Sequence, residues 1–202
     1  MRTSTKHRTT KETDIEISLT LEGGAVDVKS GSGFFDHMLT LFASHGGFGL
    51  TVKNVGDFDV DFHHSVEDIG IVLGEAFAEA LQDKRGINRY GQFLLPMDEA
   101  LVLVALDLSG RSFLAYDVPL RASRLTDEGD EQNPKVGYFD CELAEEFFLA
   151  FTRAANVTLH IKELSGKNTH HILEAVFKGF GRAMKEACTI TGTTLPSTKG
   201  VL

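Results

Sequence analysis

The motif HHxxE occurs twice in the sequence, at residues 63–67 and at residues 170–174. Apolar residues at helical spacing follow each copy, so each motif is predicted to open an amphipathic helix. On a helix, the first histidine and the glutamate of the motif share one face. The second histidine points about 100° away, given roughly 3.6 residues per turn. One motif can therefore offer a His/Glu pair to one metal ion and its other imidazole to a second ion.

Metal binding is favoured over a structural role for these histidines. A lone histidine at a helix start is commonly a surface or capping residue, but these motifs sit at matching places in the two halves and use four of the eight histidines. Imidazole and carboxylate ligands suit Mn, Zn, Fe or Co better than Ca or Mg. The lack of a nearby cysteine disfavours a structural zinc site. The motifs supply six candidate metal ligands: His63, His64, Glu67, His170, His171 and Glu174.

The elements that position the motifs are predicted in the same order in both halves. In the first half, periodicity predicts strands at residues 10–21 and 25–29, an interrupted strand at residues 48–55 and 58–62, and helices at residues 34–44 and 63–84. After a connector at residues 85–96, it predicts strands at residues 99–108, 112–118 and 157–162, and helices at residues 141–154 and 170–191.

This repeat predicts an α+β fold of two tandem pseudo-symmetric halves, residues 1–92 and residues 93–202 with a C-terminal tail. Each half is expected to be a mixed sheet covered by two helices, in the order strand-strand-helix-strand-helix. Together the halves are expected to form one compact domain.

The repeat also relates single residues in the two halves. His37 in the first short helix corresponds to Glu146 in the second, so both are candidates for a further metal ligand. Asp36, beside His37, is a candidate hydrogen-bond partner for an imidazole. His45 lies at a helix end, where a positive charge is favourable. Four scattered basic residues lie near connectors and helix starts, namely Arg89, Arg111, Lys178 and Lys199. Such residues alone do not indicate a phosphate site.

Composition narrows the class of protein. The chain of 202 residues carries a net charge of −9, without a dominant Lys/Arg block, so neither nucleic acid nor a membrane surface is an expected partner. No apolar run has the length of a membrane span, and the N-terminus lacks the apolar region of a signal peptide. Cys141 and Cys188 are predicted to be reduced, buried thiols. A cytoplasmic protein is expected. The polar segment at residues 121–135 is predicted to be an exposed loop without an assigned role.

Several segments together resemble the imidazoleglycerol-phosphate dehydratase family. They are TKET at 10–13, GFFDHMLTLFASHGGF at 33–48, HHSVEDIG at 63–70, GINRYG at 86–91, MDEAL at 97–101, DLSGR at 107–111, HHILEAVFKGF at 170–180 and PSTKGVL at 196–202. The resemblance covers nearly the whole chain. It implies a cytoplasmic hydro-lyase of histidine biosynthesis with two Mn(II) ions per active site. It also implies trimers built into a 24-subunit assembly whose sites lie between subunits.

The resemblance assigns roles to particular residues. The implied metal ligands are His37, His63, His64, Glu67, His170, His171 and Glu174, and an eighth ligand, often histidine in this family, falls on Glu146. Implied substrate contacts are Glu12, His37, His45, Arg89, Arg111, His170, Lys178, Ser197, Thr198 and Lys199. The catalytic candidates are Glu12, Glu67 and Glu174, with Glu12 as the acid–base group.

The implied reaction removes water from D-erythro-imidazole glycerol phosphate and yields imidazole-acetol phosphate. The proton to be lost is not acidic. An imidazole ring whose two nitrogens bind metals can be held as imidazolate. The imidazolate expels the neighbouring hydroxide, and in the resulting diazafulvene the adjacent proton becomes acidic. The tail at residues 195–202 is predicted to fold over the phosphate and exclude water.

Two other classes of function are compatible with the motifs alone. A dinuclear metal-dependent phosphoester hydrolase would activate a water molecule between two ions. A metal-stabilised assembly would have no turnover. A hydrolase releases inorganic phosphate and a dehydratase does not, so product analysis separates the two enzymes.

Overall fold

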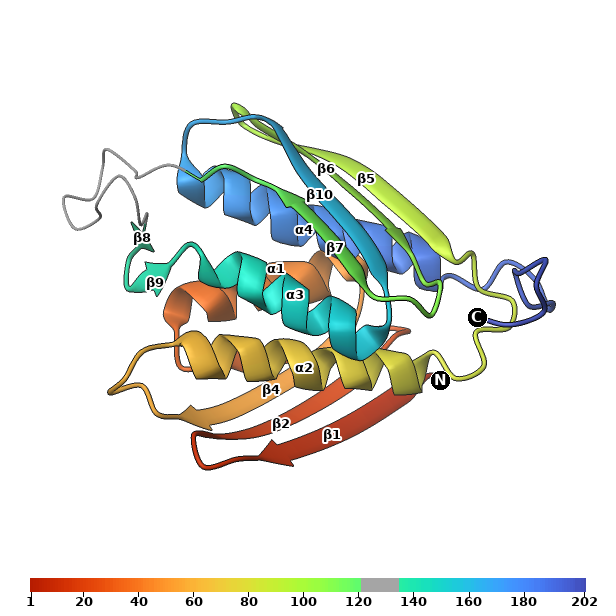
Figure 1. The fold of residues 1–202 in the computed structure, drawn as a ribbon, viewed down its shortest axis with the longest axis horizontal. Helices are drawn as coiled ribbons and strands as arrows, with labels where there is room; N and C mark the ends of the chain where they lie inside the picture. Colours follow the sequence, from red (N-terminus) through yellow and green to blue (C-terminus); the bar gives the residue numbers. More distant parts are fainter. Residues whose placement is uncertain (121–134) are drawn as a thin grey trace.

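Two four-stranded sheets enclose four helices in the computed structural model, which describes residues 1–120 and 135–202 (Figure 1). The first sheet has the order β1-β2-β4-β3 and consists of β1 Thr3–Thr9, β2 Thr13–Thr20, β3 Val26–Lys29 and β4 Gly49–Gly56. The second has the order β5-β6-β10-β7 and consists of β5 Tyr90–Met97, β6 Ala100–Asp107, β7 Phe113–Asp117 and β10 Thr158–Ser165. In each sheet the first three strands in this order are antiparallel and the last is parallel to its neighbour. The sheets therefore share one topology, as the repeat predicts.

The helices of the two halves interleave between the sheets (Figure 1). They are α1 Gly33–Gly46, α2 His63–Ala80, α3 Leu143–Ala155 and α4 Thr169–Cys188. Helix α2 packs on β1 and β2, and α4 packs on β5 and β6, whereas α1 pairs with α4 and α3 pairs with α2. A short hairpin of β8 Lys135–Val136 and β9 Phe139–Asp140 precedes α3. The two halves thus form one core.

Alternating apolar residues direct one face of each sheet onto the helices. Ile15, Ile17 and Leu19 of β2 are buried, and their neighbours along the strand face outward, because successive side chains of a strand point to opposite sides. Between the helices, phenylalanine rings fill the core. The centroids of Phe42 on α1 and Phe180 on α4 are 4.9 Å apart. Each such buried ring stabilises the fold by about 1.5–3 kcal/mol.

Glycines allow the helix backbones to approach closely at equivalent places in both halves. A Cβ added at Gly74 of α2 would lie 2.7 Å from the carbonyl oxygen of Phe151 and 3.0 Å from the nitrogen of Ala155 on α3. A Cβ at Gly181 of α4 would press on the carbonyl oxygen of Phe42 on α1. Gly74 and Gly181 lie at the same distance after their HHxxE motifs. The pseudo-symmetry therefore extends to backbone packing.

The predicted α+β fold class is confirmed, but the repeat unit needs correction. Each sheet has four strands, because β1 and β5 also form. The sequence pattern does not indicate β1, because the inward positions of this strand carry polar residues such as Ser4. It also does not indicate β5, which lies mostly in the expected connector, because Gly91 and Pro96 are typical strand breakers. The boundary expected between residues 92 and 93 falls inside β5.

Two element boundaries also differ from the prediction. Residues 58–62, expected to be a strand, form a turn in which the amide of Val60 donates to the carbonyl of Asp57. Helix α2 ends at Ala80 rather than near residue 84, because Gln82 and Lys84 adopt left-handed φ angles of 53° and 59°.

Further sequence predictions concern the thiols and membrane spans. Cys141 and Cys188 are free and buried as predicted, and burial raises both thiol pKa values to about 12. Within the described residues, no helix is both long and apolar enough to cross a bilayer. The polar segment at residues 121–135 lies, except for its last residue, outside the described residues.

Candidate functional site

One cluster of metal-ligating side chains joins α1 and α4. Ligand atoms of His37, His170 and Glu174 all lie within 4.8 Å of one another. His170 and Glu174 are one turn apart on α4, and His170 Nε2 is 3.3 Å from Glu174 Oε2. The Asn168 side chain caps α4 by accepting from the backbone amides of His170 and His171, which fixes the turn that carries the motif. Two imidazoles and a carboxylate form a donor set that fits Mn(II).

Nearby basic groups set the charge of this cluster. Burial raises the pKa of Glu174, but the ion pair with Lys178 and the charges of His170 and His37 outweigh it, so the net pKa is below its ordinary value. Glu174 is therefore ionised at neutral pH and suited to a cation. Burial and then the charge of Lys178 lower the pKa of His45, so His45 is neutral at pH 7 and does not act as a charge at the end of α1.

The second histidine of each motif contacts a carboxylate. On α2, His64 Nδ1 lies 2.9 Å from Asp57 Oδ2 and 4.0 Å from Glu12 Oε2. On α4, His171 Nδ1 lies 2.8 Å from Glu99 Oε2. Within each motif the planes of the two imidazole rings are nearly perpendicular, at 86° and 81°.

Glu146 and Asp36, which were both expected near a metal ion, are not part of the three-ligand cluster. Glu146 is in the first turn of α3 and, among the described residues, is not part of the three-ligand cluster. The prediction that Asp36 contacts an imidazole is wrong. Its Oδ1 accepts hydrogen bonds from the backbone amide and the hydroxyl of Ser30, each at 2.6 Å. Asp36 therefore stabilises the turn between β3 and α1.

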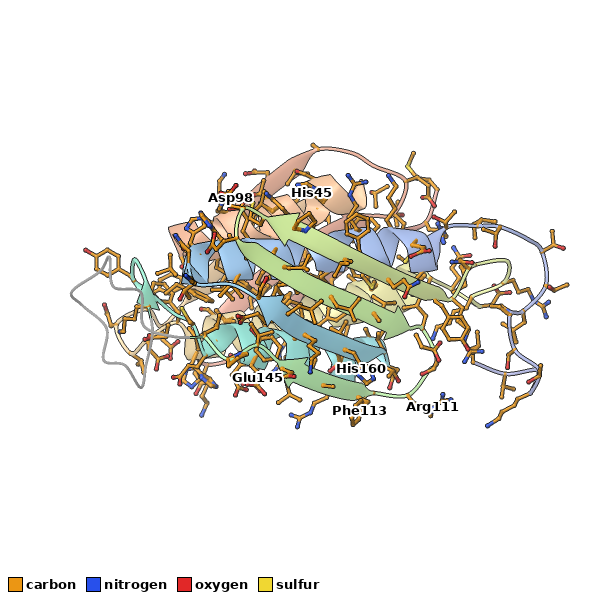
Figure 2. All side chains as sticks on the ribbon, turned by 90° about the horizontal axis from the view of Figure 1, so that it is seen from above. His45, Asp98, Arg111, Phe113, Glu145 and His160 are labelled. Atoms are coloured by element: carbon orange, nitrogen blue, oxygen red, sulfur yellow. The ribbon has the colours of Figure 1, made fainter. Side chains whose placement is uncertain are left out.

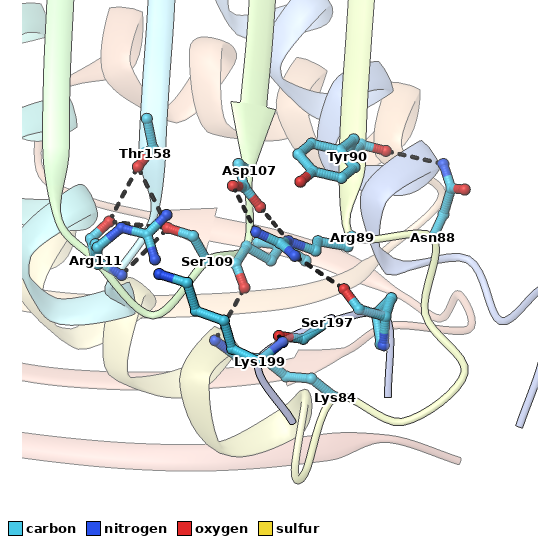
Figure 3. A network of polar contacts seen from close by, with 12 residues as sticks. Lys84, Asn88, Arg89, Tyr90, Asp107, Ser109, Arg111, Thr158, Ser197 and Lys199 are labelled. Carbon is cyan, nitrogen blue, oxygen red and sulfur yellow. Dashed lines mark hydrogen bonds and ion pairs between the residues drawn. The ribbon is translucent and has the colours of Figure 1, made fainter. Parts of the chain in front are cut away.

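A basic cluster lies where β6 ends and the C-terminal tail returns to the sheet (Figure 3). The Arg89 guanidinium donates from Nε and Nη2 to the two carboxylate oxygens of Asp107, at 2.7 and 3.0 Å. Its Nη1 donates to the carbonyl of Pro196 at 2.9 Å, which holds the tail. Arg111, Ser197 and Lys199 are drawn around the same end of the sheet in Figure 3. The predicted phosphate contacts in the tail and in the second sheet are thus brought together.

This basic cluster and the metal cluster lie at opposite ends of the molecule. The Arg89 amide donates to the carbonyl of Ala187 in the last turn of α4, whereas His170 is in the first turn. The helical rise between them corresponds to about 25 Å. Figure 2 likewise shows Asp98 and Arg111 at opposite ends of the second sheet. Predicted substrate contacts are therefore divided: Lys178 pairs with Glu174 and Glu12 lies beside His64, whereas Arg89, Arg111, Ser197, Thr198 and Lys199 lie at the far end. His45, in the last turn of α1, is near Lys178 and Arg182 on the middle of α4.

Comparison with known proteins identifies the family. The model of the family described as imidazoleglycerol-phosphate dehydratase matches residues 30–184. The chain belongs to the imidazoleglycerol-phosphate dehydratase family.

Relatives of this family match along their whole length. The imidazoleglycerol-phosphate dehydratase of Bacillus anthracis is 55% identical over 207 residues and covers 100% of both chains. That of Caldicellulosiruptor saccharolyticus is 51% identical over 196 residues, covering 96% of this chain and 95% of its own.

Solved structures of the same family share the fold. The Staphylococcus aureus dehydratase has a TM-score of 0.81 at 41% identity and covers 94% of this chain and 99% of its own. The Pyrococcus furiosus dehydratase, in complex with (S)-C348, has a TM-score of 0.80 at 39% identity, with 98% and 100% covered. The resemblance seen in the sequence is confirmed, and with it a dehydratase of histidine biosynthesis; nothing favours the hydrolase.

Two polar residues of the basic cluster were not predicted from the sequence. Asp107, which orients Arg89, is the first residue of the DLSGR segment, so its position in that family segment was the available signal. Lys84 donates to the carbonyl of Leu108 at 3.3 Å. Burial lowers its pKa, Asp107 opposes this, and Arg89 adds to it. No motif contains Lys84, and only the fold places it beside Arg89.

Replacing Asp107 with Asn is expected to loosen the tail. The change removes the charge from a bidentate pair that orients Arg89 toward Pro196, and charge-assisted bonds of this kind contribute about 1.5–3 kcal/mol. Hydrogen exchange should become faster at residues 195–202. Asp117→Asn is the control, because it loses only an exposed pair with Lys162 on the same sheet. Equal exchange in both variants would show that the tail does not depend on Arg89.

Proposed function

We propose that the protein catalyses Mn(II)-dependent elimination of water from D-erythro-imidazole glycerol phosphate, giving imidazole-acetol phosphate. The observation that carries this proposal is the convergence of His37, His170 and Glu174 in a chain of the dehydratase family. The two ions of each active site would be held by His37, His63, His64, Glu67, Glu146, His170, His171 and Glu174. When bound, Mn(II) supplies positive charge that favours the deprotonated imidazole ring of the substrate.

The residues of the chain hold the substrate and move its proton. The hydroxyl leaves from the carbon attached to the ring, and the neighbouring carbon loses its proton to Glu12 Oε2. The resulting enol ketonises to the product. Glu12 suits this role because its side chain is 54% exposed and lies 4.0 Å from His64 without a closer carboxylate–imidazole bond. Lys178 keeps Glu174 ionised through their ion pair.

The phosphate is assigned to the basic cluster. Arg89 uses three N–H groups for Asp107 and Pro196, and a guanidinium has others to offer. The remaining donors of this cluster are Arg111, Ser197, Thr198 and Lys199, and Lys178 would contribute from its place beside Glu174 in the metal cluster. With Pro196 already held by Arg89, closure of the tail over the phosphate excludes water from the site.

A complete site is proposed to need more than one chain. The separation of about 25 Å along α4 is too long for one small phosphate ester to bridge from His170 to Arg89. The site would be complete if a neighbouring subunit placed its basic cluster next to the metal cluster of this chain. This division supports a site shared between subunits, and we propose that these subunits form trimers of a 24-subunit cytoplasmic assembly.

The outer face of the second sheet supports self-association. On the second sheet, Leu101, Leu103 and Ala105 of β6 face outward, beside Leu94 of β5, which is 52% exposed. Exposed apolar side chains grouped in this way on a sheet face are typical of a protein interface. Phe113 on β7, labelled in Figure 2, is separated from this group by His160 and Lys162 of β10. The outer face of the first sheet is polar instead, with Thr5, His7, Glu16, Ser18, Thr51 and Lys53.

The direct test is an incubation of purified protein with Mn(II) and imidazole glycerol phosphate. Enolised product, followed by absorbance, is expected without release of inorganic phosphate. Phosphate release without enol would instead indicate a hydrolase. Omission of Mn(II) after chelation is the control for metal dependence.

Subunit mixing tests whether the site is shared between chains. His170→Ala and Arg89→Ala are each expected to abolish turnover alone, because one removes a metal ligand and the other a phosphate donor. Co-expressed with different tags, they should form mixed oligomers with partial activity, since some sites receive both intact residues from different chains. The matched control is His170→Ala with Glu174→Gln, whose residues belong to one cluster and cannot complement. No recovery in either mixture would place the whole site in one chain.

A further inference from the structure

Both HHxxE motifs present their second histidine to a carboxylate through the same ring nitrogen. His64 Nδ1 is 2.9 Å from Asp57 Oδ2, and His171 Nδ1 is 2.8 Å from Glu99 Oε2. A neutral imidazole whose Nδ1–H donates a hydrogen bond to a carboxylate keeps its lone pair on Nε2. Metal-binding histidines are commonly fixed in this way, and the carboxylate orients the ring and strengthens the ligand.

Glu99 is hydrogen-bonded to the residues at the start of α4. Its Oε1 accepts from the backbone amides of Asn168 and Lys167, at 2.8 and 3.3 Å, while its Oε2 takes the His171 ring. The turn between β5 and β6 is thereby joined to the residue that caps α4. The His171 ring is held relative to a fixed backbone rather than by a free side chain.

Asp57 holds His64 without an equivalent set of backbone donors. Its Oδ1 is buried and has no hydrogen-bond partner among the described residues. A buried acceptor left unpaired costs about 1–3 kcal/mol. A carboxylate retained at such a position is better explained by its bond to the imidazole than by packing.

The two carboxylates come from places that are not equivalent in the pseudo-symmetry. Glu99 is the last residue of the turn before β6, and its topological counterpart is Glu12, the last residue of the turn before β2. Glu12 Oε2 nevertheless lies 4.0 Å from His64 Nδ1, because Asp57 already occupies that nitrogen. The first half therefore uses a different residue to hold its histidine.

We propose that Asp57 and Glu99 are positioning residues that direct Nε2 of His64 and His171 toward the metals, and that Asp57 leaves Glu12 free for proton transfer. The inference rests on the proposed Mn(II) site. It explains why two topologically equivalent glutamates have different tasks: Glu99 is bound to a ligand, whereas Glu12 is not.

The test measures metal affinity apart from turnover. Asp57→Ala and Glu99→Ala are expected to bind Mn(II) about 10–100-fold more weakly, as for other residues that orient metal ligands. Free Mn(II) is measured by electron paramagnetic resonance during titration. Asp57→Asn and Glu99→Gln should recover part of the affinity, because an amide oxygen still accepts the Nδ1 proton. Asp59→Asn, an exposed change in the same loop with the same loss of charge, should bind like the unsubstituted protein.

A second readout reports the tautomer itself. Nitrogen NMR of metal-free protein with labelled histidine should show His64 and His171 protonated on Nδ1, and this signature should be lost in the alanine variants. Unchanged Mn(II) affinity in both alanine variants, or a lone pair on Nδ1 in the unsubstituted protein, would overturn the inference. Tight Mn(II) binding that depends on Asp57 and Glu99, in a protein that does not dehydrate imidazole glycerol phosphate, would sustain the inference and reject only the proposed reaction.

Discussion

Turnover is expected to fall by about 10²–10⁴-fold when Glu12 is replaced by Gln, the usual loss when a general acid–base group is removed. Glutamine keeps the size of the side chain and removes the ability to accept the substrate proton. Mn(II) content should remain unchanged, because Glu12 is not part of the cluster formed by His37, His170 and Glu174. Steady-state kinetics and metal analysis on the same sample separate these two effects.

The control for Glu12→Gln is Glu16→Gln. Glu16 lies on β2, shortly after Glu12, and pairs with Lys53 on the surface at 2.9 Å, and its replacement removes the same charge. It should keep full activity, since exposed ion pairs contribute little. Full activity in Glu12→Gln would assign the proton transfer to another group. A parallel loss of metal and activity would make Glu12 a part of the metal site instead.

The second large effect is expected on stability, from Gly181→Ala. The added methyl group would press on the carbonyl oxygen of Phe42 and lie 3.0 Å from the nitrogen of Gly46, and both atoms belong to helix backbone that cannot move aside alone. Overpacking of this kind costs about 1–3 kcal/mol or more. For a chain of this size the melting temperature should fall by roughly 3–10 °C. Calorimetry at equal protein concentration measures it.

Gly33→Ala provides the matched control in α1. A Cβ at Gly33 meets nothing within 4 Å, so the same replacement should leave the melting temperature unchanged or raise it slightly. Gly74→Ala, at the equivalent place against α3, should behave like Gly181→Ala. Equal melting of Gly181→Ala and Gly33→Ala would mean that α1 and α4 can separate without loss of stability.

The sequence predicts the helices and the inner strands because their apolar periodicity is regular. Residues such as Ile15 and Ile17 alternate cleanly, whereas β1 has polar residues on its inward side and therefore has no periodic signal. The metal cluster was predictable in its members, since His170 and Glu174 belong to one motif. That His37 reaches them depends on the pairing of α1 with α4, which local periodicity does not specify.

The carboxylates that orient other side chains were less accessible to sequence analysis. Glu99 and His171 are 72 positions apart, and Asp107 meets Arg89 at the open end of the β5–β6 hairpin. Single acidic residues at such separations carry no local pattern. Asp57 is close to its histidine in sequence, but the expected strand at residues 58–62 obscured the turn that directs it toward His64.

The interleaving of helices also sets the order of events during synthesis of the chain. Helix α1 leaves the ribosome early, but its partner α4 is made almost last. Until then, the side of α1 that packs on α4, which includes Phe42 against Phe180, lacks its native partner. Chains stalled or truncated before residue 169 would therefore expose this face and be prone to aggregation or degradation. Contacts between such distant segments also slow folding, so completion of the last helix governs when the whole core forms.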